Sequence, residues 1–383
     1  MRAVIEDLPG SKIREVANAG IGRADVLAFW FGESDEPTPD FIRAAAVRSI
    51  DAGETFYAHN LGLAELRHAL AAYVGGLHRP VEADRIAVTS SGVNALMLAM
   101  QALVGAGDEV VAVVPVWPNL TAQPAILGAL VTRVALAPRA GAWQLDLDRL
   151  LRAVTPATKV LLVNAPNNPT GWTLSREEQA AILAHCRYTG TWIVADEVYE
   201  RIHFAAGLRA APSFLDLAGP DDRLIVVHSF SKSFLMTGWR LGWMVAPDAI
   251  VPALGKLIEF NTSCAPVFVQ RAALEALAHA DAFVPGLVGR LRHCRDTLLP
   301  RLAALPGVEV AVPEGGMYAF FRLEGENDSL ALAKRLVVDA GLGLAPGVAF
   351  GPEAEGWLRW CFASRQPGRL VQGAERLERF LQL

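Results

Sequence analysis

Short apolar runs rich in β-branched residues recur along the first two-thirds of the chain, and longer amphipathic stretches separate them. Five of these runs have the pattern of buried strands: residues 85–89, 109–114, 159–164, 191–196 and 224–228. Helical patterns lie between them, for example from Gly92 to Leu103 and over residues 175–189, where Glu177 and Glu178 fall in the first turn. Alternating β and α units predict an α/β fold, with a mostly parallel sheet covered by helices on both faces.

The last hundred residues have a different pattern. A long helix is expected over residues 285–299, with Pro285 in its first turn and Pro300 just past its end. The glycine-rich stretch around Gly315 and Gly316 precedes short strands, and residues 366–381 form an amphipathic pattern typical of a final helix. We expect a second, smaller α+β domain here, against which about the first thirty residues pack. The predicted division is an N-terminal arm and small-domain segment, a large domain and a C-terminal small domain, over residues 1–40, 41–280 and 281–383.

Composition excludes several classes of protein. The 383 residues are 52% hydrophobic and 20% charged, which favours a sizeable core over disorder. The net charge is −5 and no run of lysine or arginine occurs, so nucleic acid is not expected as a partner. Four cysteines occur without a CxxC pair, which supports neither a disulfide framework nor a metal site. The sequence shows neither a signal-peptide pattern at its start nor an apolar run long enough for a membrane span, and we expect a cytoplasmic protein with no membrane partner.

One lysine stands in a segment that suits covalent chemistry. The chain has only five lysines, and Lys232 lies in Ser229-Phe230-Ser231-Lys232-Ser233, eight residues before Arg240. A lysine amine can form a Schiff base with an aldehyde cofactor, while neighbouring hydroxyls and a guanidinium can bind a phosphate group. The segment therefore predicts a site for a phosphorylated aldehyde.

Polar residues also follow the other four predicted strands, where ligands gather in a parallel sheet. Ser91-Gly92 opens a helix and could bind an anion, or it could be an ordinary helix cap. Trp117, in a proline-bounded loop, could stack on a planar ring or simply pack in the core. The turn from Asn164 to Gly171 could be only a loop. Asp196 could pair with a protonated ring nitrogen or form a structural salt bridge.

Taken together, these segments resemble the class I/II aminotransferases, which belong to the aspartate aminotransferase-like, fold-type I superfamily of enzymes that use pyridoxal 5′-phosphate (PLP). The resemblance runs from about Ala28 to the C-terminus. Its most specific segments are Ser229 to Lys232 with Met236 to Gly242, Asn168-Pro169-Thr170-Gly171, and Asp196-Glu197-Val198-Tyr199. The resemblance implies a large domain with a mostly parallel, seven-stranded sheet between helices, together with a smaller α+β domain. It also implies a homodimer whose active sites are shared across the interface.

The same resemblance implies a role for each cofactor-binding residue. Lys232 would hold PLP as a Schiff base, Asp196 would face the ring nitrogen, and Trp117 would stack on the ring face. Asn168 and Tyr199 would bind the phenolate oxygen of the ring. The phosphate would be bound by hydroxyl groups, backbone N–H groups and a guanidinium, from Ser91, Gly92, Val93, Ser229, Ser231 and Arg240. Tyr57 fits the tyrosine that reaches the phosphate of the neighbouring subunit.

On the substrate side, Arg359 would bind the α-carboxylate, and Gly32 would let the backbone approach it. Asn168 and Trp117 would also contact the substrate. The implied reaction is ping-pong transamination between an L-amino acid and a 2-oxo acid, with Lys232, Asp196 and Tyr199 as the catalytic residues. Arg359 would orient the substrate, and the freed Lys232 amine would move the proton from Cα to the cofactor.

Substrate choice is the least constrained part of the interpretation. A bacterial aspartate-specific branch of the family has a lysine where this chain has Val93, and Trp30, Phe31 and Met317 are expected to make the pocket apolar. We therefore expect a neutral or hydrophobic amino donor. The alternatives are an aspartate aminotransferase with a different ligand for the distal carboxylate, and a PLP-dependent carbon–sulfur β-lyase on the same scaffold. A PLP-sensing transcription regulator is disfavoured, because the roughly thirty residues before the core are too few for a helix-turn-helix domain.

Overall fold

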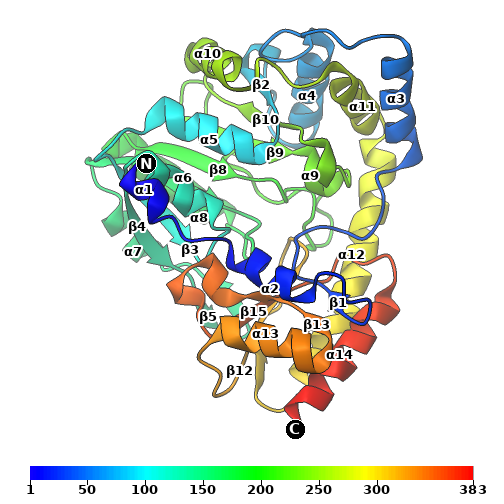
Figure 1. Ribbon diagram of the computed structural model, residues 1–383. Helices are drawn as coiled ribbons and strands as arrows, with labels where there is room; N and C mark the ends of the chain where they lie inside the picture. The colour runs from blue at the N-terminus through cyan, green and yellow to red at the C-terminus, as the bar shows by residue number, and fades with distance from the viewer. Residues whose placement is uncertain (383) are drawn as a thin grey trace.

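A seven-stranded sheet is the largest element of the computed structural model, which describes residues 1–382 (Figure 1). Its strands are β2 (Ile86–Thr89), β3 (Glu109–Val114), β4 (Leu130–Ala135), β7 (Thr158–Asn164), β8 (Trp192–Asp196), β9 (Leu224–Ser229) and β10 (Gly242–Val245). The order in space is β2-β10-β9-β8-β7-β3-β4. β10 runs antiparallel to both of its neighbours, and the other pairs are parallel. The prediction of a mostly parallel, seven-stranded sheet is confirmed.

Two of the seven strands lie outside the five apolar runs seen in the sequence. β4 is an edge strand whose residues are mostly partly exposed, and Arg133 interrupts its apolar character. β10 has only four residues and begins at Gly242. A Cβ atom at that glycine would lie 2.6 Å from the backbone nitrogen of Gly92, so the close approach of two backbones requires glycine there.

Both faces of the sheet are buried under helices. Alternate residues of β3 point into different apolar clusters, with Val110 in one and Val111 in the other. One face packs against α5 (Gly92–Leu103), α6 (Asn119–Ile126) and α10 (Val251–Thr262), and the other against α4 (Ala64–Leu77) and α8 (Arg176–Thr189). Each fully buried Val, Leu or Ile side chain contributes roughly 1.5–3 kcal/mol. The sheet is therefore a rigid base for the loops at its strand ends.

Helix ends follow local signals where packing does not override them. α5 spans the residues predicted for it, and Ser175 caps α8 through a capping box with Glu178. α12 (Ala280–Ala303) is longer than the predicted 285–299, and both Pro285 and Pro300 lie inside it. The helix continues past these prolines because its buried apolar side packs against the rest of the core.

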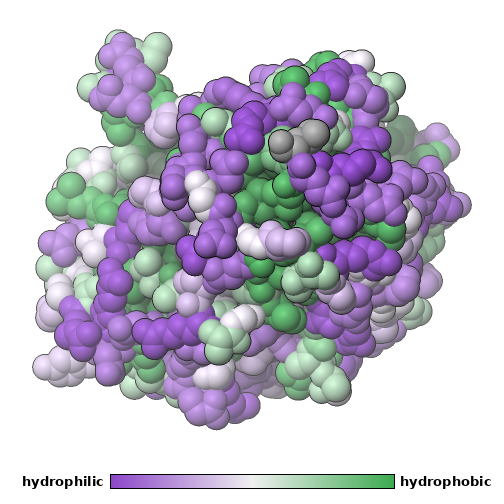
Figure 2. Space-filling view, turned by 90° about the horizontal axis from the view of Figure 1, so that it is seen from below, coloured by the Kyte–Doolittle hydropathy of each residue, from purple (hydrophilic) through white to green (hydrophobic). Residues whose placement is uncertain are grey.

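A second, four-stranded sheet forms the smaller part of the molecule. It has the order β11-β12-β15-β14, from Val308–Val310, Tyr318–Leu323, Trp357–Cys361 and Ala345–Pro346. Helices α12, α13 (Ser329–Ala340) and α14 (Pro367–Leu381) pack with it, and the C-terminus lies on this side (Figure 1). Seen from this side, the surface is largely hydrophilic around a central strip of hydrophobic residues (Figure 2).

The first thirty residues contact both parts of the chain. β1 (Leu27–Ala28) pairs in parallel with β13 (Leu342–Gly343), and α2 (Lys12–Gly20) packs against α13. The one-turn helix α1 (Ala3–Glu6) instead contacts α6 beside the large sheet. The domain boundaries at residues 40 and 280 remain predictions.

The other elements connect or cover these sheets. The remaining helices are α3 (Asp40–Asp51), α7 (Leu147–Ala153), α9 (Phe230–Ser233) and α11 (Val267–Ala278), and β5 (Ala137–Arg139) pairs with β6 (Ala142–Gln144). Within residues 1–382, no helix combines the length and the apolar composition that crossing a membrane requires.

Candidate active site

A cavity of about 1070 Å³ opens at the carboxyl ends of the parallel strands, where residues of both sheets meet. Most of the residues predicted for the site line it: Gly32, Gly92, Val93, Trp117, Asn168, Asp196, Tyr199, Ser229, Ser231, Lys232, Arg240 and Arg359. Two predicted residues, Ser91 and Tyr57, do not. The fold therefore brings together side chains that lie up to 327 residues apart in sequence.

Lys232 lies in the one-turn helix α9, directly after β9. The Ser229 hydroxyl caps this turn by accepting a hydrogen bond from the backbone N–H of Ser231, at 3.1 Å. The Nζ of Lys232 donates to the carbonyl oxygen of Gly32 at 2.5 Å. Burial lowers the pKa of Lys232 to about 8. A substantial fraction of this amine is therefore neutral near physiological pH, which is the form that attacks a carbonyl group.

Asp196 ends β8 with its side chain only 2% exposed. Its carboxylate accepts a hydrogen bond from the backbone N–H of Val198 at 3.3 Å and forms no ion pair within residues 1–382. Burial raises the pKa of Asp196 to about 7. A buried carboxylate without a cation is costly, and a protonated ring nitrogen in the cavity would supply the missing charge. This environment fits a pyridine-containing cofactor.

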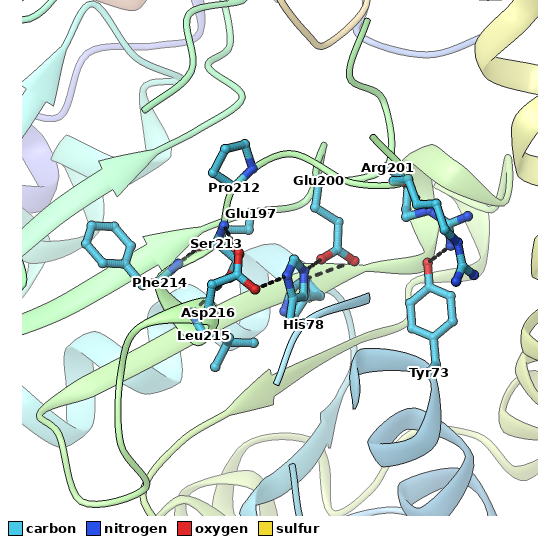
Figure 3. A network of polar contacts seen from close by, with 12 residues as sticks. Tyr73, His78, Glu197, Glu200, Arg201, Pro212, Ser213, Phe214, Leu215 and Asp216 are labelled. Carbon is cyan, nitrogen blue, oxygen red and sulfur yellow. Dashed lines mark hydrogen bonds and ion pairs between the residues drawn. The ribbon is translucent and has the colours of Figure 1, made fainter. Parts of the chain in front are cut away.

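A network of polar side chains lies beside the segment that carries Asp196 and Tyr199 (Figure 3). His78 is held between Asp216, at 3.0 Å from its Nδ1, and Glu200, at 3.2 Å from its Nε2. Burial alone would lower the pKa of His78, but these two carboxylates outweigh it and raise the pKa to about 10. For Glu200 the two effects have the opposite sign. Burial alone would raise its pKa, but the nearby histidines outweigh burial and hold the pKa of Glu200 well below its usual value.

This network was missed at the sequence level, although two of its acids follow Asp196 within four residues. His78 and Asp216 come from distant parts of the chain, so no local pattern connects them. Glu197 accepts a hydrogen bond from the backbone N–H of Phe214 at 3.2 Å, which ties the same segment to a second loop. The network therefore fixes the position of the segment that lines the cavity.

The hydroxyl of Tyr199 meets that of Tyr318, a residue of β12, with 2.6 Å between the two oxygens. Burial raises the pKa of Tyr199 well above its usual value, so this residue is a hydroxyl donor at neutral pH. Gly32 packs against the same pair, because an added Cβ would lie 2.2 Å from the Tyr318 oxygen. Tyr318 is a site residue that sequence reasoning missed. Its signal was an aromatic residue just after the Gly315-Gly316 turn.

Arg359, on β15, is 2% exposed and is held in place by neutral oxygens. Its Nη1 donates to the side-chain oxygen of Asn168 at 3.0 Å, and its Nη2 donates to the carbonyl oxygen of Trp30 at 2.5 Å. The guanidinium also lies 4.5 Å from the ring centre of Tyr318. Within residues 1–382 it has no carboxylate partner, and its Nε–H has no hydrogen-bond acceptor. A buried, unneutralised guanidinium is suited to bind a substrate carboxylate.

A second group of lining residues suits an anion. Gly92 and Val93 begin α5, whose first backbone N–H groups have no partner within the helix. The Ser229 and Ser231 hydroxyls are 2.9 Å apart, and Arg240 also lines the cavity, where its guanidinium donates to the carbonyl oxygen of Thr237. Ser91 is placed differently from these residues: it is buried, and its hydroxyl accepts a hydrogen bond from the backbone N–H of Asn94 at 3.1 Å, as an ordinary helix cap does.

Besides Ser91, three predicted contributors lie away from the cavity. The expectation that Trp30 and Met317 line the substrate pocket is wrong. Both are buried in the core, and the Trp30 ring fills the space beside Gly343. Phe31 does line the cavity. The side chain of Tyr57 is 88% exposed on the surface, so its predicted contact with the phosphate of a neighbouring subunit stays a prediction.

Comparisons with known proteins match this chain along nearly its whole length. The model of the family described as aminotransferase class I and II matches residues 25–377. The chain is 33% identical over 380 residues to a probable aspartate/prephenate aminotransferase of Aquifex aeolicus, covering 97% of this chain and 94% of that protein. It is 28% identical to aromatic-amino-acid aminotransferase 2 of Thermococcus litoralis, with 98% and 97% of the two chains covered. A solved structure of aspartate aminotransferase from Thermotoga maritima covers all of both chains, with 32% identity and a TM-score of 0.92.

Proposed function

The chain belongs to the aminotransferase class I and II family, and from this premise we propose which of its own side chains carry out PLP-dependent transamination. That the protein is a PLP-dependent aminotransferase follows from the family and from relatives that match over almost its full length. The roles of the individual residues, the class of amino donor and the dimer are our proposals. The observation that carries them is that one cavity holds a buried amine, an unpaired carboxylate and an unneutralised guanidinium: Lys232, Asp196 and Arg359.

When bound, PLP supplies a ring that accepts electrons from the carbon whose proton is removed. Lys232 would hold the cofactor covalently through Nζ, while Asp196 keeps the ring nitrogen protonated. Asn168 and Tyr199 would donate to the ring oxygen, and Trp117 would cover the ring face. The phosphate would be bound at the start of α5 and by the neighbouring hydroxyls and guanidinium, from Gly92, Val93, Ser229, Ser231 and Arg240.

Three side chains would act directly on the amino acid. Arg359 would bind the α-carboxylate, since its charge has no other partner among the described residues. Gly32 would let the backbone approach this carboxylate. Lys232 would then act as the general base. Its Nζ would take the proton from Cα of the substrate and deliver it to the cofactor. A pKa of about 8 suits both directions of this transfer.

The walls of the cavity support a neutral or hydrophobic amino donor. Phe31, Val93 and Trp117 line it, and position 93 lacks the cation that an aspartate-specific branch carries there. Relatives named for aspartate, prephenate and aromatic amino acids leave the donor class open to experiment. The remaining alternative is a carbon–sulfur β-lyase, which the same cofactor residues would also serve.

We further propose that the enzyme is a homodimer in which Tyr57 reaches the phosphate of the other subunit. Three large side chains support an interface, because Phe56, Tyr57 and Phe260 are 84%, 88% and 90% exposed. Sedimentation of the wild-type protein and of Phe260→Asp tests the dimer. A wild-type protein that sediments as a monomer would refute it.

The covalent role of Lys232 is tested by borohydride reduction. The PLP form should yield a reduced lysine adduct at residue 232, Lys232→Ala should yield none, and the exposed control Lys256→Ala should behave as wild type. An unchanged adduct in Lys232→Ala would refute the assignment. A half-reaction screen with single amino acids separates the two activities: transamination converts the cofactor to its pyridoxamine form, whereas a lyase releases pyruvate and ammonia and retains PLP.

A further inference from the structure

The loop between α9 and β10, residues 234–241, connects the segment of Lys232 with Arg240. Two residues of this loop have a backbone conformation that residues other than glycine rarely adopt, because Leu235 and Arg240 both have a φ of 55°. Such residues keep this conformation only where the surrounding contacts hold them in place. The contacts that hold the loop therefore also fix the position of the Arg240 side chain.

One buried hydroxyl from a distant part of the chain forms two hydrogen bonds to this loop. The Oγ1 of Thr38 donates to the carbonyl oxygen of Leu235 at 2.6 Å, and it accepts from the indole Nε1–H of Trp239 at 2.9 Å. Thr38 is 9% exposed and lies 197 residues before Leu235 in the chain. Its hydroxyl thus contacts one of the two residues with positive φ and the neighbour of the other.

The position of Thr38 is itself fixed by its sequence neighbours. Thr38 lies between Pro37 and Pro39, directly before the start of α3 at Asp40. The proline rings fix φ on both sides, and Pro39 restricts Thr38 to an extended conformation. Because α3 packs against α11, the Thr38 hydroxyl is anchored to the body of the molecule.

Arg240 lies against the same loop. Its guanidinium donates to the carbonyl oxygen of Thr237, and both residues line the cavity. Thr38 does not line the cavity. A change at Thr38 would therefore reach a bound ligand only through the loop that its hydroxyl holds.

We propose that Thr38 is a positioning residue for the cofactor phosphate, because its two hydrogen bonds hold residues 234–241 in the conformation that presents Arg240 to that group. The proposal rests on the proposed function, in which Arg240 binds the phosphate. A threonine hydroxyl can donate and accept at the same time, whereas valine, of similar shape, can do neither. Loss of the hydroxyl would loosen the loop and weaken phosphate binding, and it would leave the contacts of Asp196 and Trp117 with the ring in place.

The test compares the binding of PLP and of pyridoxal, the same ring without its phosphate, to the full-length apoenzyme. We expect Thr38→Val to lower the affinity for PLP about tenfold, as loss of two hydrogen bonds predicts, and to change the affinity for pyridoxal less than about threefold. Thr38→Ser keeps the hydroxyl and should restore the preference for PLP. Thr189→Val is the matched control and should change neither affinity, because the Thr189 hydroxyl also donates to a carbonyl oxygen, that of His185 at 3.1 Å, but lies away from the cavity.

A double variant shows whether Thr38 acts through Arg240. Arg240→Met should lose most of the preference for PLP over pyridoxal, and adding Thr38→Val should lower that preference no further. Equal weakening of PLP and pyridoxal in Thr38→Val, unchanged affinities, or a further loss in the double variant would each overturn the role of Thr38. If Arg240→Met instead binds PLP as the wild type does, the phosphate assignment within the proposed function is wrong. Circular dichroism shows that each apoenzyme is folded.

Discussion

Replacing His78 by glutamine tests the buried network beside the active-site segment. His78 has a folded-state pKa of about 10, against an ordinary value of 6.5, because Asp216 and Glu200 hold its protonated form. A raised pKa stabilises the fold fully below pH 6.5, and this contribution disappears as the pH rises through 10. Each pH unit between these limits removes about 1.4 kcal/mol. The variant should therefore lose roughly 4 kcal/mol at pH 7 and only about 1 kcal/mol at pH 9.

The measurement is urea unfolding of wild-type protein and variant at pH 6.5, 7, 8 and 9, with protein and PLP concentrations held fixed. The control is His279→Gln, since His279 is about half exposed and lies 3.8 Å from Glu275. An exposed pair of this kind contributes at most about 1 kcal/mol. A difference between wild type and His78→Gln that stays constant from pH 6.5 to 9 would refute the reasoning, even if the variant is strongly destabilised.

Other predictions concern the reaction site itself. The rate at which PLP reloads the apoenzyme should rise with pH and level off above pH 8, because the neutral Lys232 amine is the attacking form; a stopped-flow profile still rising at pH 10 would contradict the lowered pKa. Gly32→Ala should lower Tm, because its Cβ would meet the Tyr318 oxygen at 2.2 Å, and adding Tyr318→Phe should restore part of the loss. Tyr318→Phe alone leaves Tyr199 without its hydroxyl partner and should reduce kcat/KM about fivefold, whereas an unchanged value would make that contact irrelevant to catalysis. Arg359→Lys should raise KM for amino acids on the order of thirtyfold, since lysine cannot form two parallel hydrogen bonds to a carboxylate. Equal KM values for variant and wild type would exclude Arg359 as the residue that binds the α-carboxylate.

The sequence predicted those features of the fold and the site that depend on residues close together in the chain. Strand ends such as Asn164 and Asp196 were found because buried runs stop at polar residues, and the cap at Ser175 follows from its spacing to Glu178. Long-range contacts leave no such trace. The pairing of Tyr199 with Tyr318 depends on how the two sheets meet. For the same reason, the sequence placed Trp30 and Met317 in the pocket, while the structure buries them in the core.

The pairing of β1 with β13 has a consequence for synthesis on the ribosome. Leu27 pairs with Leu342, whereas the last strand of the large sheet ends at Val245. At roughly 5–20 residues per second, the interval between these two points takes on the order of 5 to 20 s. We expect the cofactor-binding sheet to fold during this interval, while the N-terminal strand waits for a partner that has not yet been translated. The cavity wall that carries Phe31 and Gly32 would then form last, over an already folded cofactor site.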